Sequence, residues 1–151
     1  TKHKKVKLKC VKNLLKRLKG VKSTNHTTYN LELKYFKLSE FDSPDEPGSG
    51  SNMDKKFLEK LDYARHNAGV PFRINSGYRT KRWNDKILQA RIGSSHKKGL
   101  AVDIHCIGSR NRALIIKSLM DVGINRIGIG KTFIHCDVDN IKDQDVIWLY
   151  N

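Results

Sequence analysis

Residues 94–106 read SSHKKGLAVDIHC, and the fold can be built outward from them. The end of this stretch, residues 100–106, alternates between apolar and polar side chains, a pattern typical of a half-buried strand. Its beginning is rich in serine and lysine ahead of a glycine, which favours a loop. We therefore predict a loop that carries His96 and leads into a strand with Asp103 and His105 on one face.

A second stretch, residues 132–138, has the same alternating character. Alternation places His135 and Asp137 on one face of a strand and Cys136 on the other. If the polar faces of both strands point into one cleft, the following side chains meet there: His96, Asp103, His105, His135 and Asp137.

These residue types suit a metal site. Two imidazoles, from His96 and His135, and the carboxylate of Asp103 are donors that zinc prefers. Three protein ligands leave a fourth position for water, which is the arrangement of catalytic rather than structural zinc. A chain of 151 residues can bury a sizeable core unaided, so we expect the metal to serve chemistry. Between the ligands, the small Gly99 and Ala101 fit a tight turn that passes close to other backbone.

The chain has three cysteines, Cys10, Cys106 and Cys136, and no C-x-x-C pair. An odd number without that spacing is neither a disulfide framework nor a zinc ribbon. Strand alternation turns Cys106 and Cys136 away from the polar face, so we predict buried thiols rather than metal ligands.

The rest of the chain predicts an α+β fold, a small mostly antiparallel sheet with flanking helices. A helix over residues 53–66 shows an apolar stripe. Ser51 or Asn52 can cap its start, and Gly69 can end it. The remaining predicted elements are strands at residues 70–74, 126–129 and 146–150, a helix at 83–90, and a helix at 109–122 with Leu114, Ile115, Leu119 and Met120 inward.

Charge is unevenly distributed along the chain, whose formal net charge is +15. By direct count, residues 1–37 hold 12 lysines and arginines against one acid, Glu32. We therefore divide the chain into a basic arm, residues 1–34, and a domain, residues 35–151. Apolar residues at helical spacing predict an amphipathic helix at residues 11–18. It would lie on a surface or pack against the core, and packing or disorder is favoured over membrane contact. The arm would be drawn to polyanions such as wall polymers, membrane surfaces or nucleic acid, or it would act only as a solubilising tail.

Three separated pieces of this sequence resemble the M15 family of zinc peptidases. They are the run S-x-H-x-x-G-x-A-x-D at residues 94–103, the S-G-Y-R turn at residues 76–79 and the I-H-C-D strand at residues 134–137. The opening YFKLSEF, residues 35–41, is similar as well. Over residues 36–150 the chain looks most like the D-alanyl-D-alanine carboxypeptidase-like branch found in phages and bacteria. The resemblance implies the hedgehog and DD-peptidase-like zinc peptidase fold.

The resemblance also implies roles for single residues. It makes the three donors of the predicted metal site the ligands of one zinc ion. It makes Arg79 a catalytic and substrate-binding residue, since a guanidinium can hold a carboxylate or a polarised carbonyl with paired hydrogen bonds. A structural ion pair is the alternative for this arginine. Ser76 and Tyr78 also match, as substrate-binding residues or as residues that shape the loop.

The sequence departs from the family at the residue that activates water. Some relatives carry a second histidine two residues before the last ligand, or an acid three residues before it, where this chain has Phe133 and Thr132. We predict Asp137, on the same strand face as His135, as general base, with His105 as the second choice. Either side chain would otherwise orient a ligand imidazole.

The predicted function is zinc-dependent hydrolysis of stem peptides in bacterial peptidoglycan, by an endolysin-like endopeptidase in preference to a D-Ala-D-Ala carboxypeptidase. The alternative is a non-catalytic zinc-containing module that binds cell wall or protein. No zinc finger, glycine-rich phosphate loop or aromatic–basic interleaving supports a nucleic-acid partner. No apolar run approaches the roughly 18 residues that cross a bilayer, and no signal peptide is seen. We therefore expect action at the cell wall or periplasm, with delivery by a phage or within a virion.

Overall fold

The computed structural model describes residues 31–87 and 93–151. Most of the predicted basic arm, including the helix predicted at residues 11–18, therefore lies outside the described residues. The division into arm and domain stays a prediction. No helix in the described ranges is both long enough and apolar enough to span a membrane.

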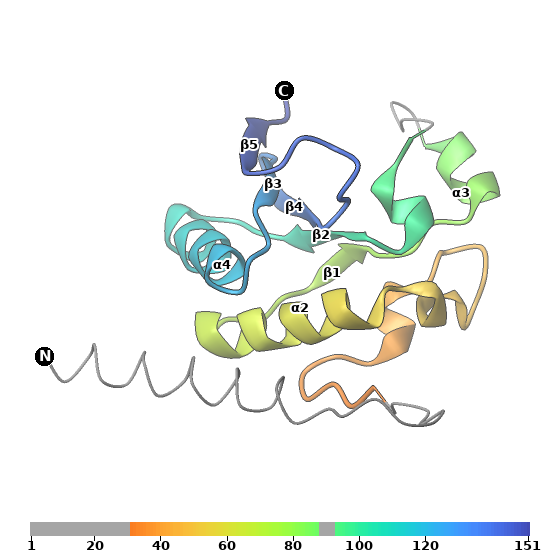
Figure 1. The fold of residues 1–151 in the computed structure, drawn as a ribbon, viewed down its shortest axis with the longest axis horizontal. Coiled ribbons are helices and arrows are strands. Elements are labelled where there is room, and N and C mark those ends of the chain that lie inside the picture. Colours follow the sequence, from red (N-terminus) through yellow and green to blue (C-terminus); the bar gives the residue numbers. More distant parts are fainter. Residues whose placement is uncertain (1–30, 88–92) are drawn as a thin grey trace, which may run out of the picture. The chain divides into compact units, whose positions relative to one another are not determined.

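A five-stranded sheet runs through the described domain in the order β1-β2-β4-β3-β5 (Figure 1). Three of its four pairings are antiparallel, and only β3 and β5 run parallel. The predicted α+β class with a mostly antiparallel sheet is therefore confirmed. The strands are β1 (Ile74–Ser76), β2 (Ala101–His105), β3 (Arg126–Ile129), β4 (Phe133–Asp137) and β5 (Val146–Leu149).

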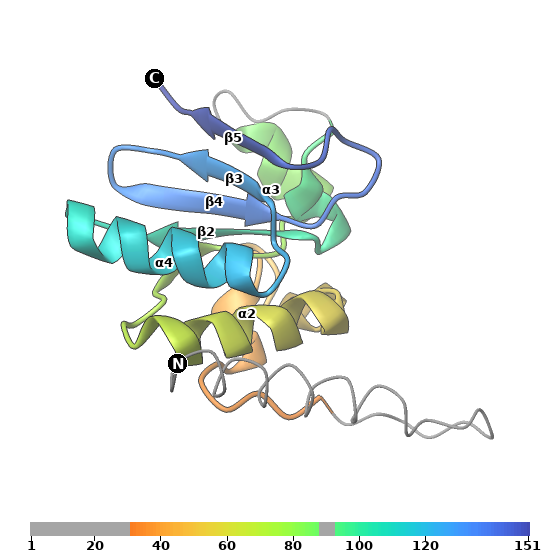
Figure 2. The same cartoon turned by 60° about the vertical axis from the view of Figure 1, so that its left-hand side comes forward.

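Two helices, α2 (Lys55–Ala68) and α4 (Ser109–Asp121), lie side by side against one face of this sheet (Figure 2). Apolar side chains on that face, such as Val102 and Ile134, are fully buried in a common core with them. Burial of this apolar surface is the main force that holds the two layers together. Alternation along the strands leaves the polar side chains on the opposite face. The helices contribute Phe57, Leu58, Leu61, Ala64, Ile115 and Leu119 to the core.

The shorter helical segments lie in the connections. They are the helix α3 (Lys81–Lys86) and three single turns of 3-10 helix, η1 (Leu38–Phe41), η2 (Ser49–Asn52) and η3 (Ser95–Lys98).

The start of α2 corrects the predicted cap. Asp54, rather than Ser51 or Asn52, is the capping residue, because its carboxylate accepts a hydrogen bond from the backbone N–H of Phe57 at 2.8 Å. The end is as predicted, since Gly69 adopts the left-handed conformation with φ of 65°.

Two other boundaries also differ. The strand predicted for residues 70–74 is displaced towards the C-terminus and becomes β1, where Ile74 and Ser76 pair with β2. The helix predicted to begin at Trp83 begins earlier, because the hydroxyl of Thr80 caps it by accepting from the Trp83 backbone N–H at 3.0 Å.

Helix α4 buries a narrower stripe than predicted. Ile115 and Leu119 are buried, but Met120 is 47% exposed, so its predicted inward position is wrong. The buried Ser118 takes its place, because it lies three residues after Ile115 and therefore on the same side of the helix.

The turn between η3 and β2 needs a glycine for two reasons. Gly99 has φ of +69°, and a Cβ there would lie 2.2 Å from the backbone oxygen of Asn52. The carbonyl of Gly99 also accepts a hydrogen bond from the backbone N–H of Asp54 at 3.0 Å. The predicted tight turn close to other backbone is thus confirmed, and it ties the loop that carries His96 to the start of α2.

Candidate metal centre and its surroundings

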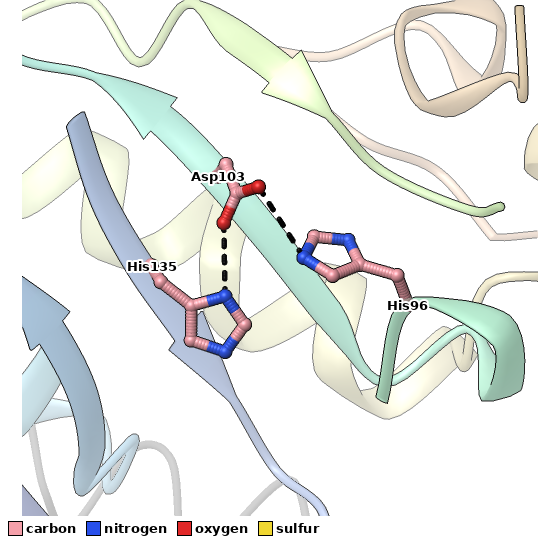
Figure 3. Close-up of side chains that lie close together, drawn as sticks. All are labelled: His96, Asp103 and His135. Carbon is pink, nitrogen blue, oxygen red and sulfur yellow. Dashed lines mark hydrogen bonds and ion pairs between the residues drawn. The ribbon is translucent and has the colours of Figure 1, made fainter. Parts of the chain in front are cut away.

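Three side chains meet on the sheet face opposite to α2 and α4. His96 comes from η3, Asp103 from β2 and His135 from β4 (Figure 3). Asp103 and His135 are partners in the antiparallel register, so both point to the same side of the sheet. One donor atom from each of the three residues lies within 4.8 Å of the other two. The structure therefore brings the three predicted metal ligands together.

Asp103 lies between the two imidazoles. Its Oδ1 is 2.8 Å from Nδ1 of His135, and its Oδ2 is 3.3 Å from Nε2 of His96. Burial alone would raise the pKa of Asp103, but the hydrogen bonds to His135 and His96 outweigh it and hold the pKa well below its usual range. Asp103 is therefore an anion at neutral pH, as a metal ligand must be.

The outer nitrogen of each imidazole is fixed by an acceptor. Nδ1 of His96 is 2.8 Å from the backbone oxygen of Gly77, which can only accept, so this nitrogen carries the proton. Nε2 of His135 is 2.9 Å from Oδ2 of Asp137 and donates in the same way. The inner nitrogens, Nε2 of His96 and Nδ1 of His135, both face Asp103.

The surroundings shift the pKa values of the two imidazoles in opposite directions. Burial lowers the pKa of His96, which favours the neutral ring that a metal requires. Burial would also lower the pKa of His135, but hydrogen bonds to Asp103 and Asp137 outweigh it and raise the pKa. The raised pKa favours the protonated His135 ring between the two carboxylates, and a divalent ion bound there would take the place of that positive charge.

The residues present fit zinc. Two imidazole nitrogens and one carboxylate oxygen form a donor set that leaves a fourth position for water. The hydrogen bonds from the outer nitrogens to Gly77 and Asp137 are of the kind that orient ligand imidazoles in zinc sites.

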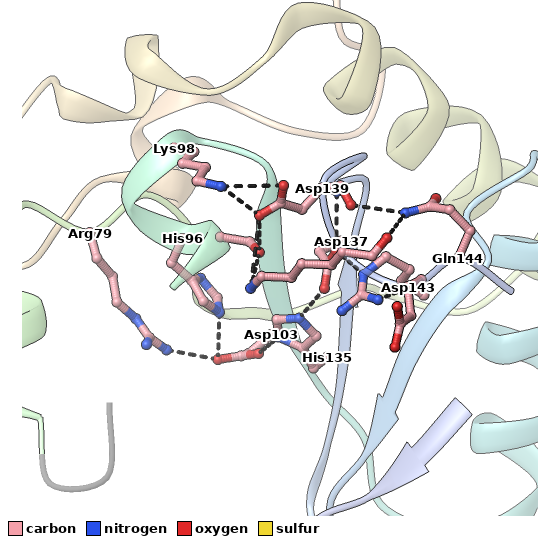
Figure 4. Close-up of polar contacts among 12 residues, drawn as sticks. Arg79, His96, Lys98, Asp103, His135, Asp137, Asp139, Asp143 and Gln144 are labelled. Atoms are coloured by element: carbon pink, nitrogen blue, oxygen red, sulfur yellow. Dashed lines mark hydrogen bonds and ion pairs between the residues drawn. The ribbon is translucent and has the colours of Figure 1, made fainter. Parts of the chain in front are cut away.

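The carboxylate of Asp137 is buried and engaged through both oxygens (Figure 4). Oδ2 accepts from His135, and Oδ1 accepts from Nε of Arg126 at 2.7 Å and from the backbone N–H of Asp139 at 3.1 Å. Arg126 also donates to the backbone carbonyl of Asp143. Burial would raise the pKa of Asp137, but the hydrogen bonds from His135 and Arg126 lower it. This geometry orients the His135 ring.

A second buried carboxylate anchors the loop that carries His96 (Figure 4). Oδ2 of Asp139 accepts from the hydroxyl of Ser95 at 2.8 Å and pairs with the ammonium group of Lys98 at 3.0 Å. Lys142 donates to the same hydroxyl at 2.8 Å. Because Ser95 precedes His96 in the chain, this network fixes where the imidazole lies.

Arg126 and Asp139 were not found by reasoning from the sequence. The signal for Arg126 was a charged residue at the start of an apolar strand. The signal for Asp139 was an acid two residues after Asp137, which would share its face if the strand alternation continued. A buried arginine nearly always has a partner. The sequence does not say which strand supplies it, since that depends on the register.

Arg79 lies beside the three donors. Its Nη2 donates to Oδ2 of Asp103 at 3.0 Å, and its Nε donates to the hydroxyl of Ser76 at 2.8 Å. Only 13% of its side chain is exposed. The structure thus joins Arg79 and Ser76 to the group of metal donors.

Two other predicted site residues stand apart from this hydrogen-bonded group. Tyr78 packs against the hydrophobic core. His105 is half-buried on the same face of β2 as Asp103, two residues further along, and it pairs in register with Phe133. Its imidazole takes no part in the hydrogen bonds among the donors.

The two cysteines near the site face the core. Cys106 and Cys136 are buried free thiols on the helix side of the sheet, as predicted. Burial raises the pKa of both thiols, which keeps them protonated.

Comparison with known proteins gives one match. Residues 34–137 match the family model described as Peptidase M15. The matched range covers most of the chain and includes η3, β2 and β4, which carry the three donors, together with Arg79. It ends before β5. No curated protein and no solved structure matches the chain.

Proposed function

This chain belongs to the M15 peptidase family, and on that premise we propose that it hydrolyses peptide bonds in the stem peptides of bacterial peptidoglycan with the help of one zinc ion. The observation that carries the proposal is the convergence of His96, Asp103 and His135, with both inner ring nitrogens facing one carboxylate. Family membership makes the chain a metallopeptidase. The peptidoglycan substrate is supported by the resemblance of its motifs to wall-directed relatives.

Zinc held by these donors would polarise the scissile carbonyl and lower the pKa of a bound water. The protein's own contribution is to fix the donors in place before the substrate arrives. Gly77 and Asp137 hold the outer ring nitrogens, and the Asp139 network holds the loop of His96. Such preorganisation avoids the cost of rearranging dipoles during the reaction.

Arg79 is the side chain that we expect to touch the substrate beside the donors. A guanidinium has five N–H groups, and here one donates to Ser76 and one to Asp103. The others are suited to bind the carbonyl oxygen as negative charge develops on it, or a carboxylate of the substrate. Ser76 would position this guanidinium, and Tyr78 would support the loop from the core side.

We assign orientation to Asp137 and proton transfer to His105. The sequence favours Asp137 as the base, but its oxygens are engaged by His135 and Arg126. His105 shares the polar face of β2 with Asp103. An imidazole can accept a proton from water and pass it to the leaving amine.

The wider setting of the reaction is also part of the proposal. The net charge of +15 favours encounter with anionic wall polymers at low salt. We place the enzyme at the cell wall or periplasm, delivered by a phage or within a virion, and we favour cleavage within the stem peptide over removal of its terminal D-Ala.

Digestion of purified muropeptides with and without a chelator tests the proposal. Mass spectrometry of the products should show cleavage that is lost with the chelator and restored by zinc. His96→Ala should abolish cleavage, whereas His66→Ala, which changes an exposed histidine of α2, should not.

A binding module is the alternative, and Phe133 and Thr132 favour it because they replace the acid–base residues of some relatives. If the chain binds one equivalent of zinc but cuts no stem peptide, the proposed enzyme activity is wrong and this alternative takes its place.

A further inference from the structure

A row of paired residues crosses the sheet on the face that carries the metal donors. His135 pairs with Asp103 on one side and with Gly128 on the other. Gly128 in turn pairs with Trp148 on β5. Paired residues on neighbouring strands point to the same side of a sheet. Trp148 therefore lies on the face of the donors, on the side away from Arg79, which is bonded to β1 through Ser76.

Gly128 leaves room for two aromatic rings beside His135. A Cβ at this position would lie 2.4 Å from Cε2 of Tyr150 and 2.7 Å from Cε2 of Trp148. Because glycine has no Cβ, the ring centroid of Trp148 lies 5.5 Å from that of His135, and the centroid of Tyr150 lies 6.3 Å from it.

Phe133 completes what we call the aromatic cluster, which consists of Phe133, Trp148 and Tyr150. The ring of Tyr150 is 5.1 Å from that of Phe133 and 6.1 Å from that of Trp148. The guanidinium of Arg126 lies 5.3 Å from the centroid of Trp148. Neighbours thus hold the rings in place, yet Tyr150 is 43% exposed and the other two rings are partly exposed. The cluster is a preformed aromatic surface beside the donors.

We infer that the aromatic cluster is a saccharide-binding subsite for the amino sugar to which the stem peptide is attached. The inference rests on the proposed function and names a second part of the substrate. Stem peptides carry small or charged side chains near the sugar, such as alanine and glutamate, which would leave the aromatic surface uncovered. The sugar ring offers a face of C–H groups to the rings, and its hydroxyls suit the phenol O–H and indole N–H at their edges.

The order of the strands gives the bound substrate a direction. Arg79 lies on the β1 side of the donors and the aromatic cluster on the β5 side, so the substrate crosses the strands. The ring centroids of Trp148 and Tyr150 lie 5.5 Å and 6.3 Å from that of the ligand His135. An extended peptide covers about 3.4 Å per residue, so this distance corresponds to about two residues. The scissile bond therefore lies close to the sugar, and the cluster selects the sugar-proximal bonds rather than the terminal D-Ala-D-Ala bond.

Most of the aromatic cluster lies outside the range that matches the family model. The family match ends at residue 137, so Trp148 and Tyr150 lie outside it. The donors come from the matched range, whereas most of the proposed sugar contact comes from β5 and the residue that follows it.

Two substrates of equal peptide sequence test the inference: a stem peptide linked to the disaccharide of peptidoglycan, and the same peptide without sugar. With the zinc-loaded full chain we expect kcat/KM to be roughly tenfold higher for the sugar-linked form, which corresponds to about 1.4 kcal/mol. Trp148→Ala and Tyr150→Ala should bring the ratio towards one without changing zinc affinity, and Trp148→Phe should restore part of it. Leu149→Ala is the matched control, because Leu149 lies between them, points to the other face and is 74% exposed.

Binding of the free disaccharide gives a readout that does not depend on turnover. In a Trp83→Phe background, Trp148 is the remaining tryptophan, and its fluorescence should change as the disaccharide is added. Equal rates on both peptides, with no fluorescence change, would overturn the sugar subsite and leave the proposed function standing. Failure to cut either peptide would instead count against the proposed function.

Discussion

At the scale of single residues, the two ligand imidazoles donate hydrogen bonds to acceptors of different charge. His96 donates to a neutral carbonyl, that of Gly77, whereas His135 donates to the carboxylate of Asp137. A carboxylate draws the N–H proton more strongly and makes the other ring nitrogen a better donor. We therefore expect His135 to bind the metal more tightly than His96, and we expect this difference to depend on Asp137.

The variant Asp137→Asn tests this dependence. It keeps the shape of the side chain but removes the charge that His135 faces, so zinc affinity should fall about 10–100-fold. Competition with a chromophoric chelator would measure the affinity. Asp143→Asn is the control, because Arg126 contacts Asp143 only through its backbone carbonyl. Unchanged affinity together with a collapse of the hydrolysis rate would instead make Asp137 the general base.

At the scale of elements, turns position half of the site. The sheet places Asp103 and His135 through their register, but His96 and Arg79 lie on segments whose positions depend on glycine and on side-chain anchors. The turn at Gly99 is the most restricted of these segments because it joins a left-handed conformation to a close backbone contact.

Gly99→Ala should therefore destabilise the domain more than an ordinary glycine substitution. A left-handed residue with a side chain costs about 1–2 kcal/mol, and here the contact with the backbone of Asn52 adds to it. Gly69→Ala is the matched control, since Gly69 has a similar φ of +65° but open space around the added Cβ. Denaturant unfolding of both variants measures the difference. Equal losses of stability would show that the loop can move away from the added Cβ without a further loss in the free energy of unfolding.

Asp45 anchors the segment that follows Arg79. From its pKa we predict that the stability of the domain depends on pH. A hydrogen bond from Ser43, opposed by burial and reinforced by Thr80 and Arg82, lowers the pKa of Asp45 to about 2. Because this folded-state pKa lies below the unfolded value of about 3.9, the stabilisation is complete above about pH 4 and is lost as the pH falls towards 2.

Thermal unfolding between pH 2 and pH 6 checks this expectation on metal-free protein. Asp45→Asn should unfold at a lower temperature than the parent at pH 6, and the gap should narrow as the pH approaches 2. A gap that stays constant across this range would remove Asp45 as the source of the dependence.

Local patterns in the sequence were enough to predict much of this fold. Alternation identified β2 and β4, and a motif of fixed spacing identified His96 and Asp103. The cap of α2 by Asp54 and the exposure of Met120 were missed. A shift of one or two residues in the helix start or in the apolar stripe changes which residue caps the helix and which side chains are buried. Arg126 was missed for a different reason, since its partner lies on another strand and only the register reveals it.

At the scale of the whole molecule, most of the net charge lies outside the residues that form the described domain. Residues 1–30 contain 10 lysines and arginines and no acid, so of the net charge of +15 only +5 belongs to residues 31–151. Packing against the core is already present at Leu31 and Leu33, and the backbone N–H of Tyr35 donates to Asp62 at 2.8 Å.

Deleting residues 1–30 should therefore leave a folded peptidase with weaker attraction to polyanions. We expect hydrolysis of soluble muropeptides to be unchanged and binding to anionic wall polymers to fall, with a shallower dependence on salt. Sedimentation with purified walls at several salt concentrations measures this. Unchanged wall binding would leave the arm with the role of a solubilising tail.

The position of the cysteines has a consequence for the surroundings in which the protein can work. Cys106 donates its backbone N–H to Thr132, and Cys136 lies four residues further along β4, about 13 Å away. A disulfide needs Cα atoms within about 7 Å, so oxidants cannot join these two thiols without breaking the sheet. Both thiols also lie beneath the sheet, whereas the metal donors lie above it. Within the described residues, oxidation of Cys106 or Cys136 would therefore take place on the face of the sheet opposite to the metal donors.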